Sequence, residues 1–338
     1  MLAQPNALDW DGRPGHYEVY YLTLTDPVTG VGLWIRYTMV APLQSTAAPA
    51  ACALWFLTMD PRPGRRPTSG RKATFPIEQL RAENEPFRLT IADSVLTDTG
   101  MQGGFEEVSW DLRWTSADRH YEHVHTVLRR AKLAQTVLVL PQADLVIDGR
   151  VSYAGEELEL RGVRGGQAHL WGSKHARSWA WVHCNDLRTL DGDPMPGAFV
   201  DAVSVFVPRF GRELGPNTPV VGRFEGEDFI STSPLRVLAN ESVFALSGWR
   251  FEAVARSRKL VAEVDADRAL LAGVTYHDPD GARAYCYNSE TASMRVHVYE
   301  RARHVGGWRH RQTLVADGRA HFEYGQRAPV EAARLVLQ

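Results

Sequence analysis

The chain has 338 residues, of which 44% are hydrophobic and 23% charged, the balance of an ordinary soluble globular protein. This length predicts one large domain or two medium-sized ones. The net charge of −2 gives no electrostatic reason to expect a nucleic acid or an anionic lipid surface as a partner.

The cysteine content favours a reducing compartment. Cys52, Cys184 and Cys286 are odd in number and far apart, so they predict neither a disulfide framework nor a CxxC metal knuckle. The first residues lack the basic segment and apolar core of a signal peptide, which predicts a cytoplasmic protein. Only four of the 38 basic residues are lysine. This arginine bias is typical of a GC-rich coding sequence and favours a bacterial origin.

The N-terminal part of the chain is expected to form strands. Residues 17–42, "YEVYYLTLTDPVTGVGLWIRYTMVAP", predict a long hairpin. Residues 37–59 carry no charge and would be long enough for a membrane helix, but Pro42 and Pro49 interrupt them. A strand, a loop and a second strand are therefore predicted, with no membrane span. A transient contact with a membrane surface stays open.

Helices are scarce in the predicted structure. The best candidate is residues 77–87, "IEQLRAENEPF", a short helix that ends before Pro86. Alternation of apolar and polar residues marks strands over 87–96, 109–116 and 294–300. Glycine-containing turns recur between such runs. The pattern predicts an all-β sandwich or barrel.

A second series of strands is expected to begin after the glycine-bearing segment "RGVRGGQ", residues 161–167. We therefore divide the chain into two β domains, residues 1–165 and residues 166–338. No strict short repeat and no low-complexity linker marks the boundary.

Residues 169–187, "HLWGSKHARSWAWVHCNDL", concentrate aromatic and polar side chains. If residues 179–186 form a strand, alternation gives it two different faces. The first face carries Trp179, Trp181, His183 and Asn185, and the second carries Ala180, Val182, Cys184 and Asp186. Neither face suits water, so we predict a strand covered on both sides, with the first face lining a pocket for a bulky apolar ligand.

Simpler roles compete with the pocket. The two tryptophans of the first face would serve equally as ordinary core, and a buried His183 as an inert hydrogen-bonding group. Cys184 is expected to be a buried hydrophobic residue with no basic partner to activate it.

The same stretch, preceded by "LRGVRGGQ", resembles the His/Trp-Gly, Trp-x-Trp and Cys-Asn pattern of one superfamily. It contains carotenoid hydratases (hydroxyneurosporene synthases), tocopherol cyclases, AttH-like proteins and certain natural-product Diels–Alderases. The opening "GLWIRYTMVAP" and "ALWF" are similar to the first hairpin of the AttH-like members, and "YCYNSETASMRVHVYERA" and "GWRHRQTLVADGRAHFEYGQR" to their final strands. The resemblance implies two lipocalin-like (calycin) antiparallel β-barrel domains packed together, with a large hydrophobic cavity.

The resemblance also implies non-redox chemistry without a metal or organic cofactor. The substrate would be a hydrophobic isoprenoid-like, polyene or polyketide-like molecule, and the reaction a hydration, a ring closure or a cycloaddition. Alkene protonation needs one acid and aromatic faces that stabilise positive charge. The candidate proton donors are His169, His183 and Asp186. The candidate substrate-binding residues are Trp171, Trp179, Trp181 and Asn185. No carboxylate in the chain is matched to the acid of a hydratase.

Three alternatives stay open. A cycloaddition would need shape alone and no acid. A non-catalytic carrier of a lipophilic molecule would use the same pocket, and a structural or interaction module would have no cavity. Nothing in the sequence indicates an oligomeric state.

The histidine-rich segment "RHYEHVH" is the best metal candidate. On a strand, His123 and His125 would share one face and His120 and Glu122 the other. Two imidazoles can ligate zinc or iron, but the spacing supplies no third ligand. We therefore predict no metal, and a histidine-rich strand near a pocket or the surface.

Other catalytic patterns are lacking. The sequence has no glycine-rich phosphate loop between a strand and a helix and no G-x-S-x-G elbow. Glu157 and Glu159 alternate with leucines as on a half-exposed strand, which disfavours a glycosidase pair.

Overall fold

The computed structural model describes residues 2, 4–46, 48–115, 119–130, 134–209, 212–302, 306–331 and 333–337. Strands make up 64% of the structure and helices 5%, which confirms the predicted all-β fold. The strands form two large sheets, and one of them closes nearly into a barrel.

Within the described residues the first sheet has twelve strands, in the order β4-β3-β2-β1-β12-β11-β9-β8-β7-β6-β5, with β10 paired to β11. All of these pairs are antiparallel. The bounds are β1 (His16–Thr25), β2 (Gly32–Ala41), β3 (Ala51–Met59), β4 (Thr68–Pro76), β5 (Leu80–Asn84), β6 (Phe87–Ile91), β7 (Ser94–Thr97), β8 (Gly100–Phe105), β9 (Val108–Trp114), β10 (Tyr121–Glu122), β11 (Thr136–Tyr153) and β12 (Glu156–Gly172).

The second sheet has thirteen strands within the described residues, and its main path runs β18-β17-β15-β13-β24-β23-β21-β20-β19. Its pairs are antiparallel except for β22 with β25, which is parallel. The bounds are β13 (Ser178–Cys184), β14 (Arg188–Thr189), β15 (Phe199–Arg209), β16 (Arg212–Asn217), β17 (Val220–Phe224), β18 (Glu227–Ser231), β19 (Glu241–Ala245), β20 (Gly248–Ala255), β21 (Arg258–Asp265), β22 (Ala272–His277), β23 (Arg283–Arg301), β24 (Trp308–Gln326) and β25 (Leu335–Leu337).

Helical elements are few and short. They are η1 (Gln44–Thr46), η2 (Ile77–Gln79), α1 (Thr126–Arg130), α2 (Pro234–Ala239) and η3 (Arg268–Leu270). Across the described ranges, no helix has the length and hydropathy that crossing a bilayer requires. The uncharged run 37–59 is strand, loop and strand, as predicted.

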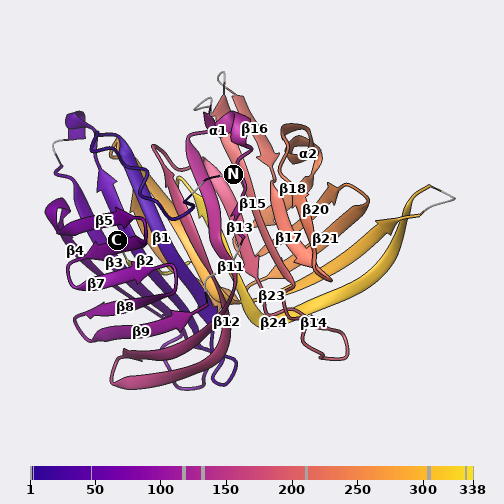
Figure 1. The fold of residues 1–338 in the computed structure, drawn as a ribbon, viewed down its shortest axis with the longest axis horizontal. Coiled ribbons are helices and arrows are strands. Elements are labelled where there is room, and N and C mark those ends of the chain that lie inside the picture. Colours follow the sequence, from indigo (N-terminus) through magenta and orange to yellow (C-terminus); the bar gives the residue numbers. More distant parts are fainter. Residues whose placement is uncertain are drawn as a thin grey trace.

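The two sheets lie side by side, the first in indigo to magenta and the second in pink to yellow (Figure 1). The chain passes from one to the other between Gly172, where β12 ends, and Ser178, where β13 begins. The predicted boundary after residue 165 lies inside β12. The division into two separate folding units stays a prediction.

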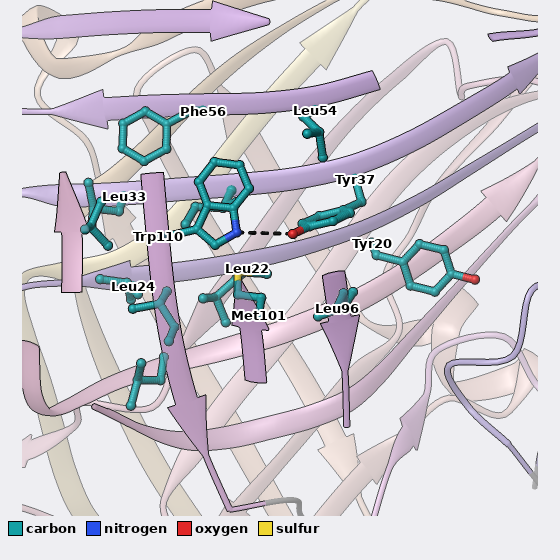
Figure 2. Close-up of a cluster of buried hydrophobic side chains, with 14 of the residues drawn as sticks. Tyr20, Leu22, Leu24, Leu33, Tyr37, Leu54, Phe56, Leu96, Met101 and Trp110 are labelled. Atoms are coloured by element: carbon teal, nitrogen blue, oxygen red, sulfur yellow. Dashed lines mark hydrogen bonds between the residues drawn. The ribbon is translucent and has the colours of Figure 1, made fainter. Parts of the chain in front are cut away.

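Each sheet curves around its own apolar core, so its interior is filled with side chains. In the first core the Tyr37 hydroxyl accepts a hydrogen bond of 3.1 Å from Trp110 Nε1, among closely packed leucines (Figure 2). The second core is built around Phe229, Phe251 and Phe322. Space for a ligand therefore has to be sought outside these two cores.

Strands at the junction between the sheets are buried on both faces. On β1, Tyr20 and Leu22 enter the first core, whereas Tyr17 and Tyr21 face the second sheet. Two apolar clusters join the sheets. One contains Tyr17, Tyr21, Trp181 and Phe199, and the other contains Trp34, Trp55, Trp179, Tyr276 and Cys286.

The predicted helix over residues 77–87 is wrong. Only η2 is helical there, and β5 follows it and pairs with β6, so that Leu80 lies opposite Ile91. An isolated helix of this length is marginal, whereas pairing with β6 gives partners to the backbone groups on one side of β5. The edge of the sheet therefore determines the local structure.

Candidate functional site

Strand β13 has the two faces that its sequence predicts. Ala180, Val182 and Cys184 belong to the second core, while Trp179 and Trp181 belong to the clusters between the sheets. Burial raises the pKa of Cys184 to about 12, so this thiol stays protonated and acts as a hydrophobic side chain. The strand is thus covered on both sides, as expected.

Asp201 on β15 is the centre of a buried polar network that β13 contacts. Trp181 Nε1 donates to Oδ1 at 3.0 Å, and His183 Nδ1 lies 2.9 Å from Oδ2. His123 Nε2 lies 2.8 Å from Oδ1. These imidazoles lower the pKa of Asp201 to about 2, against the opposing effect of burial. The network joins β13 and β15 to the segment after β10.

Trp179 lies over Gly325 on the neighbouring strand β24, and its Nε1 donates to Glu323 Oε2 at 3.2 Å. A Cβ atom at Gly325 would fall inside the indole ring. Glycine at this position therefore allows the indole to lie flat against the sheet.

Gly325→Ala is expected to destabilise the protein by about 2 kcal/mol, because the extra methyl group displaces the Trp179 ring from a packed position. Urea unfolding measures the change. Gly248→Ala is the matched control, since the only atom near its added methyl would be the Val264 carbonyl oxygen at 3.4 Å. Equal stabilities of the two variants would contradict this placement of Trp179.

A cavity of about 190 Å³ lies between the sheets. It opens to solvent at the exposed residues Thr74 and His277. Strands β1 to β4 form one side, and β22 with His175 forms the other. The lining residues are Tyr17, Val19, Arg36, Thr38, Met39, Val40, Ala51, Cys52, Ala53, Trp55, Lys72, Thr74, His175, Thr275, Tyr276 and His277. The cavity thus combines aromatic walls with a few polar groups, the usual composition of a ligand site.

His175 presents a neutral imidazole to this cavity. Its ring stacks on Tyr17 with centroids 4.5 Å apart, and its Nδ1 lies 2.6 Å from Asp278 Oδ1. Burial lowers the pKa of His175. With Nδ1 held by Asp278, the buried Nε2 has no hydrogen-bond partner among the described residues, and it is free to accept a proton.

Arg36 on β2 is the charged residue of the cavity wall. It is 5% exposed, and its buried Nε and Nη1 have no hydrogen-bond partner among the described residues. Burial lowers the pKa of nearby Lys72, and the charge of Arg36 lowers it further. The charge on this side of the cavity is therefore positive.

Two carboxyl groups lie on the second sheet at the junction, Glu290 buried and Glu323 half-buried. Burial raises the pKa of both Glu323 and Glu290. Glu290 Oε1 is 2.6 Å from His321 Nδ1, and burial lowers the pKa of that imidazole, so the pair is uncharged. Glu323 interacts electrostatically with Arg36, and the Cys286 thiol interacts with both Glu323 and Tyr276. Neither carboxyl group was among the sequence candidates.

The predicted site residues lie in several different places. On β12, His169 Nε2 is 2.8 Å from Glu18 Oε1 and its Nδ1 is 2.8 Å from the Pro5 carbonyl oxygen, while Trp171 packs beside it with ring centroids 4.6 Å apart. Asp186 accepts a hydrogen bond of 2.5 Å from Arg319. Neither the cavity nor its mouth includes these residues.

The other predicted residues lie nearer to the junction. Asn185 follows the end of β13 and donates to the carbonyl oxygens of Leu145 and Gly165 at 3.3 and 2.8 Å, which ties β13 to the first sheet. Trp179, Trp181 and His183 lie between the sheets but do not line the cavity. Their contact with a ligand stays a prediction, as does the choice of His169, His183 or Asp186 as the acid.

The histidine-rich segment does not form the expected strand. Strand β10 ends at Glu122, His123 is buried against Asp201, and His125 immediately precedes α1. Among the described residues, no three His, Cys, Asp or Glu side chains converge on a position for a metal ion.

No family model matches the chain. Its sequence is similar to that of an uncharacterized protein of Mycobacterium tuberculosis, from strains CDC 1551 and H37Rv. The identity is 28% over 324 residues, which cover 96% of this chain and 90% of the relative.

Solved structures show that the fold is the lipocalin-like fold of AttH-like proteins. An AttH protein from Nitrosomonas europaea superposes with a TM-score of 0.53 at 14% identity, covering 97% of this chain and 100% of that one. Kievitone hydratase from Nectria haematococca gives 0.53 at 8%, covering 96% and 91%. CghA with Sch210972 gives 0.54 at 7%, covering 96% and 94%. These similarities show a common fold, and the resemblance to carotenoid hydratases stays a prediction.

Proposed function

We propose that the protein is a hydratase or cyclase that acts on a hydrophobic small molecule containing an alkene, in the cavity between the sheets. One observation carries the proposal. A neutral imidazole and aromatic side chains line the cavity, and behind its wall lies Glu323, a carboxyl group whose pKa burial raises. Paired acid and base groups whose pKa values are shifted by burial are typical of proton-transfer sites.

The two groups have complementary roles in this proposal. Glu323 supplies the proton that forms the new C–H bond, and Tyr276, which interacts with Cys286 beside Glu323, is the cavity residue nearest to this carboxyl group in the proposed proton path. His175 Nε2 accepts the proton of the water or substrate hydroxyl that attacks the neighbouring carbon, while Asp278 orients the ring. That proton returns to Glu323, so the cycle closes without a cofactor.

Two of the solved neighbours are compatible with this proposal. One is a hydratase that is named for kievitone, and the other is CghA with Sch210972. The isoprenoid-like, polyene or polyketide-like substrate inferred from the sequence is proposed here on the same basis. A non-catalytic carrier is the alternative, since the cavity would serve either role. A purely structural module is disfavoured because a lined cavity exists.

Turnover in D₂O separates these alternatives. Purified protein is incubated with kievitone, linear isoprenoid alcohols and acids, and conjugated polyenes, and the products are analysed by mass spectrometry and NMR. A protonation-initiated hydratase or cyclase is expected to place one deuterium on a product carbon, because the acid exchanges with solvent. A cycloaddition would give product without deuterium, and a carrier would return every ligand unchanged. Either result would contradict the proposal.

A further inference from the structure

Arg36 is a buried cation without an anionic partner. No carboxylate lies within ion-pair distance of its guanidinium among the described residues, and its Nε and Nη1 lack hydrogen-bond partners. A buried charge normally has a paired or hydrogen-bonding partner, because desolvation is costly. The guanidinium lines the cavity, so a ligand can supply that partner.

Aromatic rings surround this guanidinium. Its Cζ lies 4.4 Å from the ring centroid of Tyr276, 5.0 Å from that of Trp34 and 5.7 Å from that of Trp55. Lys72 Nζ lies 4.2 Å from the Trp55 ring as well. These rings stabilise the two cations by cation–π attraction but leave the N–H groups of Arg36 unpaired. Because these aromatic rings already hold two cations, they are not free to stabilise a carbocation.

The acidic groups around the cavity do not neutralise Arg36. Asp278 is committed to His175 and to Arg327, whose Nη1 donates to its Oδ2 at 2.5 Å. Glu323 receives the Trp179 N–H and forms no ion pair with Arg36 within the part of the chain that the structure describes, and burial raises its pKa. The remaining titratable groups that line the cavity are Tyr17, Cys52, Lys72, Tyr276 and His277, and none of them is an anion at neutral pH.

We propose that the cavity binds the acidic group of its ligand, so that the substrate is a hydrophobic alkene that carries a carboxylate. The Arg36 N–H groups bind the carboxylate oxygens, and Lys72 adds a second positive charge. This inference rests on the proposed function and specifies its substrate class. Where the alkene is conjugated with the carboxylate, addition of the nucleophile to the β-carbon develops negative charge on the carboxylate oxygens, which Arg36 stabilises until Glu323 protonates the α-carbon.

The size of the cavity is consistent with this binding mode. A volume of about 190 Å³ is close to the roughly 150 Å³ of an apolar cavity that holds benzene. It therefore accommodates a carboxylate with a ring or a short branched segment. The rest of a longer molecule extends past Thr74 and His277, at the open end.

Paired probes test the inference without requiring turnover. Geranic acid and geraniol differ in the acidic group but share the isoprenoid chain, and calorimetry at pH 7 measures their binding. We expect the acid to bind at least about tenfold more tightly to the wild-type protein, because charge-assisted hydrogen bonds replace hydration at Arg36. Arg36→Met is expected to abolish this preference.

Lys72→Met provides a second variant, since Lys72 is only half-buried and its loss is less damaging to folding. It is expected to reduce the preference for the acid severalfold. Arg71→Met is the matched control, because Arg71 lies next in the same strand but pairs with Glu107 at the surface, so the preference should be unchanged. Circular dichroism and thermal unfolding confirm that each variant is folded.

Equal binding of acid and alcohol to the wild-type protein would overturn the inference, and so would a preference that persists in both cavity variants. Failure of the proposed function is distinguishable from these results. Selective binding of the acid with no deuterated product would retain the anion site and reject the enzyme. Turnover of neutral alkenes, with equal binding of acid and alcohol, would retain the enzyme and reject the anion site.

Discussion

Glu323→Gln is expected to lower turnover by about 100-fold or more while ligand binding is retained, because the amide keeps the shape of a neutral carboxyl group but has no acidic proton. Trp179 Nε1 can still donate to the amide oxygen. Turnover of the wild-type protein should fall as pH rises through the raised pKa of Glu323, since only the protonated carboxyl group donates. Initial rates from pH 5 to 9 measure both effects.

The stability of the same variant gives an independent readout. A carboxyl group whose pKa is raised in the folded state binds a proton more tightly there than in the unfolded chain. Its contribution to wild-type stability is therefore lost as pH rises from the ordinary glutamate pKa of 4.5 through the folded-state pKa. Glu323→Gln lacks this loss and should be the more stable protein at high pH.

Glu290→Gln is the matched control for the acid. It removes another carboxyl group on the same sheet whose pKa burial and the nearby Glu323 raise, but this group contacts His321 and not Trp179. Its turnover should change by less than about tenfold. Loss of turnover in this variant, with normal rates in Glu323→Gln, would assign the acid to Glu290.

Asp201→Asn is expected to destabilise the protein by about 3 kcal/mol at pH 7, because it breaks a buried network that joins three elements. The carboxylate lies near His183 and His123 and accepts the Trp181 N–H. Its pKa is lowered to about 2, so its stabilising effect is present above pH 3.8 and is lost as pH falls toward 2. The difference from the wild type should shrink over that range.

Urea unfolding at pH 7 and at pH 3 measures this difference. Asp186→Asn is the control, because Asp186 is partly exposed and its ion pair with Arg319 should contribute only about 1 kcal/mol or less. A stability of Asp201→Asn equal to that of the control would show that the Asp201 network contributes little to the packing of the two sheets.

The sequence predicts the fold class well because alternation is a local property. The pattern of β13 predicts which side chains share a face, and the charge-free run 37–59 predicts strands because prolines interrupt it. Residue spacing predicts the wrong structure for residues 77–87, where helical spacing competes with pairing at a sheet edge. Asn185 was assigned to the His183 face, but β13 ends at Cys184 and the next residues leave the strand.

The cavity is harder to predict because it is formed by strands from opposite ends of the chain. Arg36 is the only charged residue in "GLWIRYTMVA", which is a visible signal of a buried charge. Its significance depends on the second sheet, which brings Tyr276 and Glu323 to it. His175 lies in the aromatic segment 169–187, yet its role as a proton acceptor depends on the contact between its Nδ1 and Asp278. No local spacing in the sequence reveals that Asp278 lies nearby.

Because the cavity lies outside the two filled cores, the residues that select a ligand differ from many of the residues that stabilise the fold. Residues such as Ala51, Ala53 and Thr74 line the cavity without belonging to the core of either sheet. Evolution can therefore enlarge or reshape the space that they border while the cores of both sheets remain intact. A protein with this fold can come to bind different ligands by substitution of a few side chains at the junction between the sheets.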